Sequence, residues 1–190
     1  MAKYEIKDGV GIIPEGTTVI ENYAFDDSTE LTSVVIPDSV TEIGKLAFYG
    51  CTGLTSIVIP DSVTKIGDSA FNGSGLINIV IPKSVKNIGL DAFMDCNNCV
   101  SISVMGPVNF LQYNVFANCM KLETITFGTG IKKIDPGFLK VYNKNSDNVR
   151  IGSKYDFPPT LKAIYVPAKK TDYYKQRLPQ FLHSIIVEKQ

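Results

Sequence analysis

Three consecutive segments of the chain have nearly the same sequence, and this repetition constrains the fold more than any other feature. They read LTSVVIPDSVTEIGKLAF from Leu31, LTSIVIPDSVTKIGDSAF from Leu54 and LINIVIPKSVKNIGLDAF from Leu76. One such unit is too short to bury its own apolar side chains, so successive units must stack and share a core. The sequence therefore predicts a solenoid, whose broad surface is available for contact with a partner.

Two markers place the rest of the chain in the same register. The residue that ends each apolar run recurs at intervals of 22 or 23 residues and then once after 39 residues, at Ile13, Ile36, Ile59, Ile81, Val104, Phe127 and Val166. A phenylalanine follows about twelve residues later at Phe25, Phe48, Phe71, Phe93 and Phe116, and the sixth unit has Leu139 beside Phe138. Two markers in step indicate a structural repeat through most of the chain.

The unit that begins at Leu54 suggests the shape of one coil. Its β-branched residues alternate with others from Leu54 to Ile59, which predicts a short half-buried strand. Pro60 ends this strand because proline has no N–H for the sheet. Gly67 indicates a backbone bend that a side chain would obstruct. The segment from Asp68 to Phe71 is long enough for about one helical turn.

The pattern L-x-x-I-x-I-P-x-S-V-x-x-I-G-x-x-A-F-x-x-C, with its period of 23 residues, resembles the BspA-like leucine-rich repeats. Residues 31–98 carry it clearly, and residues 10–30, 99–140 and 161–167 carry it in weaker form. The resemblance implies a leucine-rich-repeat solenoid that is β-dominated, right-handed and curved, with a parallel sheet and short helical turns. Members of the family are commonly bacterial or protozoan surface proteins. It therefore implies a non-enzymatic protein-interaction or adhesion module that is secreted or presented at a cell surface.

We expect a single domain over residues 1–190, whose first and last layers are atypical because they must cover an exposed core. An N-terminal cap is expected over residues 1–12, repeats over 13–140, an insertion loop over 141–160, and the last strand with a strand-helix-strand cap over 161–190. The residues expected to cover the first layer are Tyr4, Ile6, Val10 and Ile12. A helix over Thr171 to Phe181 is expected to close the last layer, with Tyr174, Leu178, Phe181 and Ile185 in the core.

The insertion after Leu139 is rich in Asn, Ser, Asp and Lys, which is typical of a loop. One interpretation is a solvated connection to the last unit. The other is a recognition loop, since aromatic and arginine side chains are enriched in binding surfaces. Its candidate contact residues are Tyr142, Arg150, Tyr155 and Phe157. In that case the chain would be a structural or glycan-binding domain that uses residues 141–160.

A second candidate surface follows from the alternation of side chains in the predicted strands. Stacking turns each outward position into a row along the sheet. The row of most interest contains Val35, Val58, Val80, Ser103, Thr126 and Tyr165. It is small and uncharged, which suits contact with a protein partner or with another copy of the chain. The alternative is that valine stands there only because it favours strands.

Charge and hydropathy exclude some classes of partner. The chain has 19 acidic and 19 basic residues, and its lysines are dispersed, so we expect no nucleic-acid binding. No apolar run approaches the roughly 20 residues that a membrane span needs. The first residues lack the apolar segment of a signal peptide, so the protein is expected to be intracellular unless a leader has been removed.

The cysteines and the histidine do not form a recognisable reactive site. Cys96 and Cys119 are one repeat apart, at a spacing of about 4.8 Å that permits a disulfide, but Cys51 at the same position has no such partner. Buried thiols are therefore the favoured interpretation. Cys96 and Cys99 have the spacing of a zinc site, yet Cys99 replaces the leucine of the repeat, and the only histidine, His183, lies in the expected cap. We predict no metal, no cofactor and no catalytic residues.

Overall fold

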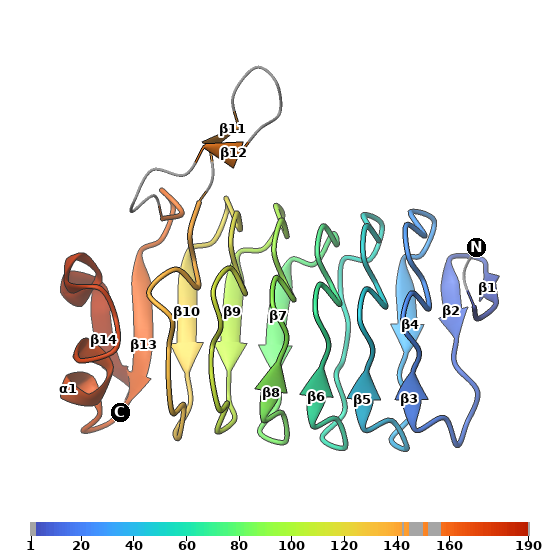
Figure 1. The fold of residues 1–190 in the computed structure, drawn as a ribbon, viewed down its shortest axis with the longest axis horizontal. Coiled ribbons are helices and arrows are strands. Elements are labelled where there is room, and N and C mark those ends of the chain that lie inside the picture. The colour runs from blue at the N-terminus through green and yellow to red at the C-terminus, as the bar shows by residue number, and fades with distance from the viewer. Residues whose placement is uncertain (1–2, 142, 145–149, 152–156, 190) are drawn as a thin grey trace.

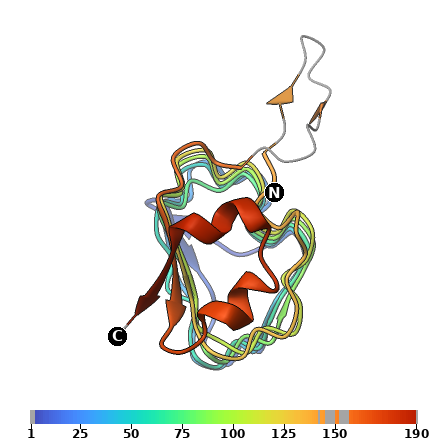
Figure 2. The same cartoon turned by 90° about the vertical axis from the view of Figure 1, so that its left-hand side faces the viewer.

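The computed structural model describes residues 3–141, 143–144, 150–151 and 157–189, and they form a stack of coils with one repeat per coil (Figure 1). Viewed along the axis of the stack, the coils trace nearly the same outline (Figure 2). The predicted leucine-rich-repeat solenoid with a parallel sheet is therefore confirmed. Residues one repeat apart pair along the stack, so the backbone N–H and C=O groups of these strands form hydrogen bonds with the neighbouring coils.

One wall of the solenoid consists of two sheets, whose inner strands come from apolar runs of the repeats and whose outermost strands come from the two ends of the chain. The first sheet contains β1 (Ile6–Lys7), β2 (Val10–Ile12) and β4 (Ser33–Val35). The second sheet is entirely parallel and contains β7 (Asn78–Ile81), β9 (Ser101–Val104), β10 (Thr124–Phe127), β13 (Ala163–Pro167) and β14 (Ile186–Lys189).

A separate parallel sheet of four short strands forms a different wall of the solenoid. In Figure 1 its arrows point in the direction opposite to those of the parallel strands of the two sheets described above. It contains β3 (Val19–Ile20), β5 (Glu42–Ile43), β6 (Lys65–Ile66) and β8 (Asn87–Ile88). A separate antiparallel pair, β11 (Asn143–Lys144) and β12 (Arg150–Ile151), comes from the insertion and stands outside the stack of coils (Figure 1).

The segment from Leu54 to Ile59, which the sequence predicts to be a strand, lacks regular strand pairing between β4 and β7. The predicted alternation of burial is nevertheless present. Leu54 and Ile59 are buried, whereas Ser56 and Val58 are exposed. The apolar side chains that enter the core therefore fix which way this segment faces, even without a regular ladder of hydrogen bonds.

A column of phenylalanine rings runs through the core at the second marker position. From Phe25 to Phe116, neighbouring ring centroids are 5.0 to 5.7 Å apart. The ring of Phe138 lies 6.5 Å from that of Phe116 in an edge-to-face contact, and the backbone pairing places Leu139 at the marker position with Phe138 just before it. These rings are fully buried, and each therefore fills the space between two coils.

The predicted helical turn around Asp68 to Phe71 is wrong, because this segment is a chain of tight turns. The N–H groups of Ala70 and Asn72 bond back three residues, whereas those of Ser69 and Phe71 bond to the next coil. Ser69 has a φ of 52°, which a right-handed helix does not allow. Alternating bonds of this kind join the coils to one another, which a helical turn would not do.

The C-terminal cap has the predicted strand-helix-strand order, but its helix is divided. Helix α1 (Thr171–Lys175) is followed by a 3₁₀ helix, η1 (Gln180–Ile185), because Pro179 cannot continue a helix. Both lie across the end of the last coil (Figure 2). Tyr174 stacks on Phe127 at 5.2 Å and is buried, as is Leu178.

Phe181 does not fill the core as predicted. It is 48% exposed, and Leu182 is buried in its place because the 3₁₀ turn of η1 rotates the helix relative to the predicted α-helix. Ile185 is partly buried against the core.

The N-terminal cover is smaller than the sequence predicts. Tyr4 and Ile6 pack against the core, and the ring of Tyr4 lies 5.6 Å from that of Phe25. Val10 and Ile12 are exposed, because in β2 it is Gly11 between them that faces inward. A Cβ atom on Gly11 would lie 2.9 Å from the side chain of Leu31.

Candidate functional site

The valine ladder, which we define as Val35, Val58 and Val80, is the most exposed apolar feature of the sheet wall. These side chains expose 73%, 80% and 56% of their surface. They lie one repeat apart on three successive coils, between inward residues such as Val34 and Ile79 that are buried. The coils therefore align three β-branched side chains in one row that faces solvent.

Strand pairing extends this row in both directions. Ile12 pairs with Val35 and is 44% exposed, which adds a fourth apolar residue before the ladder. After Val80 the row continues through the predicted residues Ser103, Thr126 and Tyr165 and then through Val187. Ile12 directly precedes the marker Ile13, as Val35 precedes Ile36, so the repeat period was sufficient to predict that Ile12 belongs to this row. Val187 lies in the cap, where the repeat motif offers no signal.

A parallel row of small polar side chains lies beside the ladder on the same wall. It contains Ser33, Ser56, Asn78, Ser101 and Thr124. The Ser101 hydroxyl and the Asn78 Oδ1 lie 2.7 Å apart in a hydrogen bond between adjacent coils. The two rows contain no ionisable group before Tyr165, so a partner that covers them would not have to desolvate a formal charge there.

The four candidate residues of the insertion are not brought together by the described part of the chain. Tyr142 and Tyr155 lie outside the described residues. Arg150 begins β12. Phe157 packs against the C-terminal cap, where its ring centroid is 4.7 Å from that of Phe181 in an edge-to-face contact. Phe157 therefore contributes to the packing of the cap.

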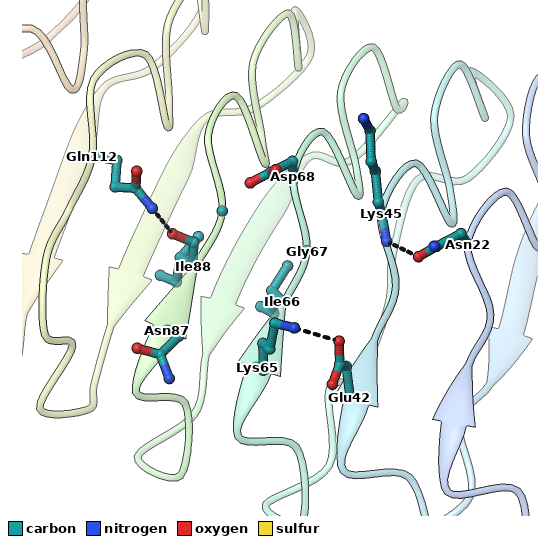
Figure 3. Close-up of a pocket in the computed structure, with 11 residues that line it drawn as sticks. Asn22, Glu42, Lys45, Lys65, Ile66, Gly67, Asp68, Asn87, Ile88 and Gln112 are labelled. Carbon is teal, nitrogen blue, oxygen red and sulfur yellow. Dashed lines mark hydrogen bonds and ion pairs between the residues drawn. The ribbon is translucent and has the colours of Figure 1, made fainter.

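A polar groove of about 410 Å³ lies over the four-stranded sheet, on a different wall from the valine ladder (Figure 3). It crosses the coils from Asn22 to Gln112 and includes one ion pair, Lys65 to Glu42, at 2.7 Å. The other polar residues that line it are Lys45, Asp68 and Asn87. No single residue of this group stands out in the sequence, because each occupies an ordinary solvent-facing position of its own repeat.

All four cysteines are buried free thiols, including Cys96 and Cys119. The Cys51 thiol donates a hydrogen bond to the Phe25 carbonyl at 3.0 Å. Burial raises the pKa values of Cys51 and Cys96 to about 12. A hydrogen bond with Cys99, together with burial, raises the pKa of Cys119. Buried thiols are inaccessible to reagents and therefore poor nucleophiles, so the four cysteines act in packing.

We expect no reaction between the native protein and iodoacetamide at pH 8, and alkylation of four thiols per chain in denaturant. Rapid alkylation of the native chain would contradict the burial of the thiols.

Stability should fall at high pH. Burial gives Cys51 and Cys96 pKa values of about 12, against 9.0 for an ordinary thiol, so these thiols ionise at a lower pH in the unfolded chain than in the folded one. Their contribution to stability is therefore complete below pH 9 and declines as the pH rises from 9 toward 12. Urea unfolding at pH 7.5 and 10.5 measures this loss. Cys51→Ser, which introduces the residue found at Ser28 and Ser74, should show a smaller loss of stability between the two pH values.

His183 lies in the cap, as the sequence predicts, and its Nε2 is 3.1 Å from the Leu178 carbonyl oxygen. Among the residues that the structure describes, no three His, Cys, Asp or Glu side chains are arranged to hold a metal ion. None of the helices in the described part of the chain combines the length and the hydropathy that a membrane span requires.

The stacked coils, the inward leucine and isoleucine positions and the phenylalanine column define a leucine-rich-repeat solenoid. The chain matches the family model for the BspA type leucine rich repeat region in six copies over residues 18–145. It therefore belongs to the BspA-type leucine-rich-repeat family, whose repeats form protein-interaction modules. No curated protein sequence is found to match the chain.

Solved structures of bacterial proteins share this fold. The pneumococcal vaccine antigen PcpA is 19% identical, with a TM-score of 0.73 over 96% of this chain and 42% of its own. A leucine-rich-repeat protein of T. pallidum is 33% identical, with a TM-score of 0.52 over 60% of this chain and 58% of its own. One from Bacteroides ovatus is 22% identical, with a TM-score of 0.50 over 93% of this chain and 62% of its own. The chain thus spans less than two thirds of the length of each.

Proposed function

We propose that this chain is a non-enzymatic protein-binding module that contacts its partner through the valine ladder. The observation that carries the proposal is the alignment of three largely exposed valines in one solvent-facing row. Burial of apolar surface contributes about 25 cal/mol per Å², and the adjoining polar row adds no charged group whose desolvation would oppose binding. The wall therefore favours a partner with a flat, uncharged and apolar contact surface.

The size of the wall indicates a partner that covers more than the ladder. A stable protein interface buries roughly 800 Å² on each side, which exceeds what three valine side chains expose. Ile12 at one end, and the polar row from Ser33 to Thr124 at the side, extend the contact surface without adding an ionisable side chain. The three valines would then form its apolar centre, and the polar row its rim.

The proposed location of this module is a cell surface, where it would act in adhesion. This part of the proposal rests on the family resemblance alone. Antibodies raised against the folded chain should stain intact cells of the source organism as strongly as permeabilised cells. Staining that requires permeabilisation would remove the surface location and leave the protein-binding role to be judged by the variants below.

Replacing Val35, Val58 and Val80 together by threonine should weaken binding to a protein partner at least tenfold. Each change replaces a methyl group by a hydroxyl and so forfeits about 0.8 kcal/mol of apolar burial, while threonine keeps the shape and strand preference of valine. Binding to immobilised fibronectin, fibrinogen and collagen measures the effect. The matched control is Ser33→Thr, Ser56→Thr and Ser101→Thr in the adjoining row, which should change binding much less.

The same experiment separates the ladder from its competitors. Unchanged affinity of the valine variant would remove the ladder from consideration. If deletion of residues 143–156 then abolished binding, recognition would belong to the insertion, as in the alternative structural or glycan-binding role. Sedimentation of the unmodified chain as a dimer that the threonine variant converts to a monomer would assign the wall to self-association.

A further inference from the structure

The polar groove exists because one position of the repeat has no side chain in three successive coils. Gly44, Gly67 and Gly89 follow the strands of the four-stranded sheet, and a Cβ atom on any of them would lie within 2.8 Å of the preceding coil. The equivalent positions at the two ends are Glu21 and Gln112, where side chains return. Close stacking of the coils thus forces a floor without side chains across three coils, and Gly67 and Gly89 of this floor line the groove.

Polar side chains along this floor are held in place by one of their atoms. The Asn22 Oδ1 accepts a hydrogen bond from the Lys45 N–H at 2.7 Å, and the Asp68 Oδ1 accepts one from the Leu90 N–H at 2.9 Å. The Gln112 Nε2 donates one to the Ile88 carbonyl at 2.9 Å. Figure 3 shows the Asn22 and Gln112 bonds at the two ends of the groove.

Each of these side chains has a second polar atom without a hydrogen-bond partner among the residues that the structure describes. These atoms are the donor Nδ2 of Asn22 and the acceptors Oδ2 of Asp68 and Oε1 of Gln112. Because the first atom is fixed by the backbone, little side-chain entropy remains to be lost when the second atom binds a ligand. The groove therefore offers one fixed donor, at Asn22, and two fixed acceptors, at Asp68 and Gln112.

The charge and the floor of the groove limit the class of ligand. Its lining has two carboxylates, Glu42 and Asp68, and two ammonium groups, Lys45 and Lys65, so it carries no net charge and does not favour a polyanion. Ile66 and Ile88 point into the core and are 1% and 2% exposed, so no apolar pocket receives a peptide side chain. Neutral molecules with many hydroxyl groups match such a lining, because each hydroxyl both donates and accepts.

We propose that the polar groove binds a neutral linear oligosaccharide. Coils in the sheet are about 4.8 Å apart, a spacing comparable to the advance of one pyranose unit, so successive sugars would meet equivalent positions of successive coils. The glycine floor of three coils then accommodates about three sugars. This site is separate from the valine ladder, and neither proposal depends on the other.

The double variant Asn22→Asp with Asp68→Asn tests the site with little risk to the fold. Both substitutions keep the Oδ1 atom that the backbone holds, and together they leave the net charge unchanged. They exchange the donor for an acceptor at one end and the acceptor for a donor near the middle. The matched control is Asn78→Asp with Asp38→Asn, which makes the same exchange outside the groove.

The probes are linear hexasaccharides of glucose, mannose, galactose, xylose and N-acetylglucosamine, titrated into the full chain and followed by calorimetry and by NMR of the side-chain amides. At least one should bind saturably and shift the amide signals of Asn22, Asn87 and Gln112. The groove variant should lower that affinity at least tenfold, and the control should change it less than twofold. Failure of all five probes, equal affinity in the groove variant, or shifts confined to the Asn78 region would overturn the proposal.

Discussion

Replacing Phe71 by alanine should destabilise the solenoid by about 4 kcal/mol, since removal of a buried phenylalanine costs about 3–5 kcal/mol. The ring is fully buried and stacks on Phe48 at 5.0 Å and on Phe93 at 5.1 Å. Alanine would leave a cavity between two coils at the centre of the column, where backbone bonds to the next coil limit collapse. Urea unfolding followed by circular dichroism measures the change.

Phe71→Leu is the matched control, because leucine fills most of the space but cannot stack. We expect it to cost less than half as much as the alanine variant. The chain has no tryptophan and nine tyrosines, so tyrosine fluorescence provides a second probe of unfolding. Coincident transitions by the two probes justify a single free energy of unfolding. A cost below about 1 kcal/mol for Phe71→Ala would show that the column does not hold the coils together.

Replacing Gly67 by alanine should destabilise the chain by about 3 kcal/mol. A Cβ atom there would lie 2.7 Å from the backbone carbon of Gly44 and from the backbone nitrogen of Lys45. Neither atom can move away without separating two coils that are joined by the bond from the Gly67 N–H to the Ile43 carbonyl at 2.8 Å. The midpoint and slope of urea unfolding, compared with the parent chain, give the measurement.

Gly16→Ala is the control for this substitution. A Cβ atom on Gly16 meets nothing within 4 Å, and the φ of this residue is +82°. Its replacement should therefore cost only the backbone strain, about 1–2 kcal/mol. The order of the two variants is the test. If Gly16→Ala were the more damaging, close approach of the coils would not be what Gly67 provides.

The repeat period predicted the column, the inward markers and the exposed row of valines, because a residue that recurs once per coil meets the same surroundings in every coil. Sequence reasoning predicted at Gly67 a backbone bend that a side chain would obstruct. The structure shows that this obstruction comes from the backbone of the preceding coil. The same reasoning placed a helical turn near Asp68, where Ser69 adopts a positive φ and bonds to the next coil. Both features depend on contacts between coils, which a single repeat does not contain.

The two candidate sites differ in how much of each can be predicted from the sequence. Val35, Val58 and Val80 occupy one repeat position, so alternation along a strand was enough to place them on the surface. The groove joins Asn22, Asp68 and Gln112, whose residue types differ from coil to coil, and only the stacked backbone brings them to one floor. No periodic signal identifies such a set.

By itself, the sequence determined that this protein is a solenoid of the BspA type, which face of each strand enters the core, and which residues stack from coil to coil. Periodicity suffices for this, because burial of one apolar face per unit repeats with the chain. Only the tertiary structure decided which side chains cover the end of the solenoid and where a groove remains between the coils. In the cap, Pro179 divides the helix and buries Leu182 rather than Phe181. Between coils, close backbone contact at the glycines opens a groove. Both depend on distances between segments remote in sequence, which a local pattern does not encode.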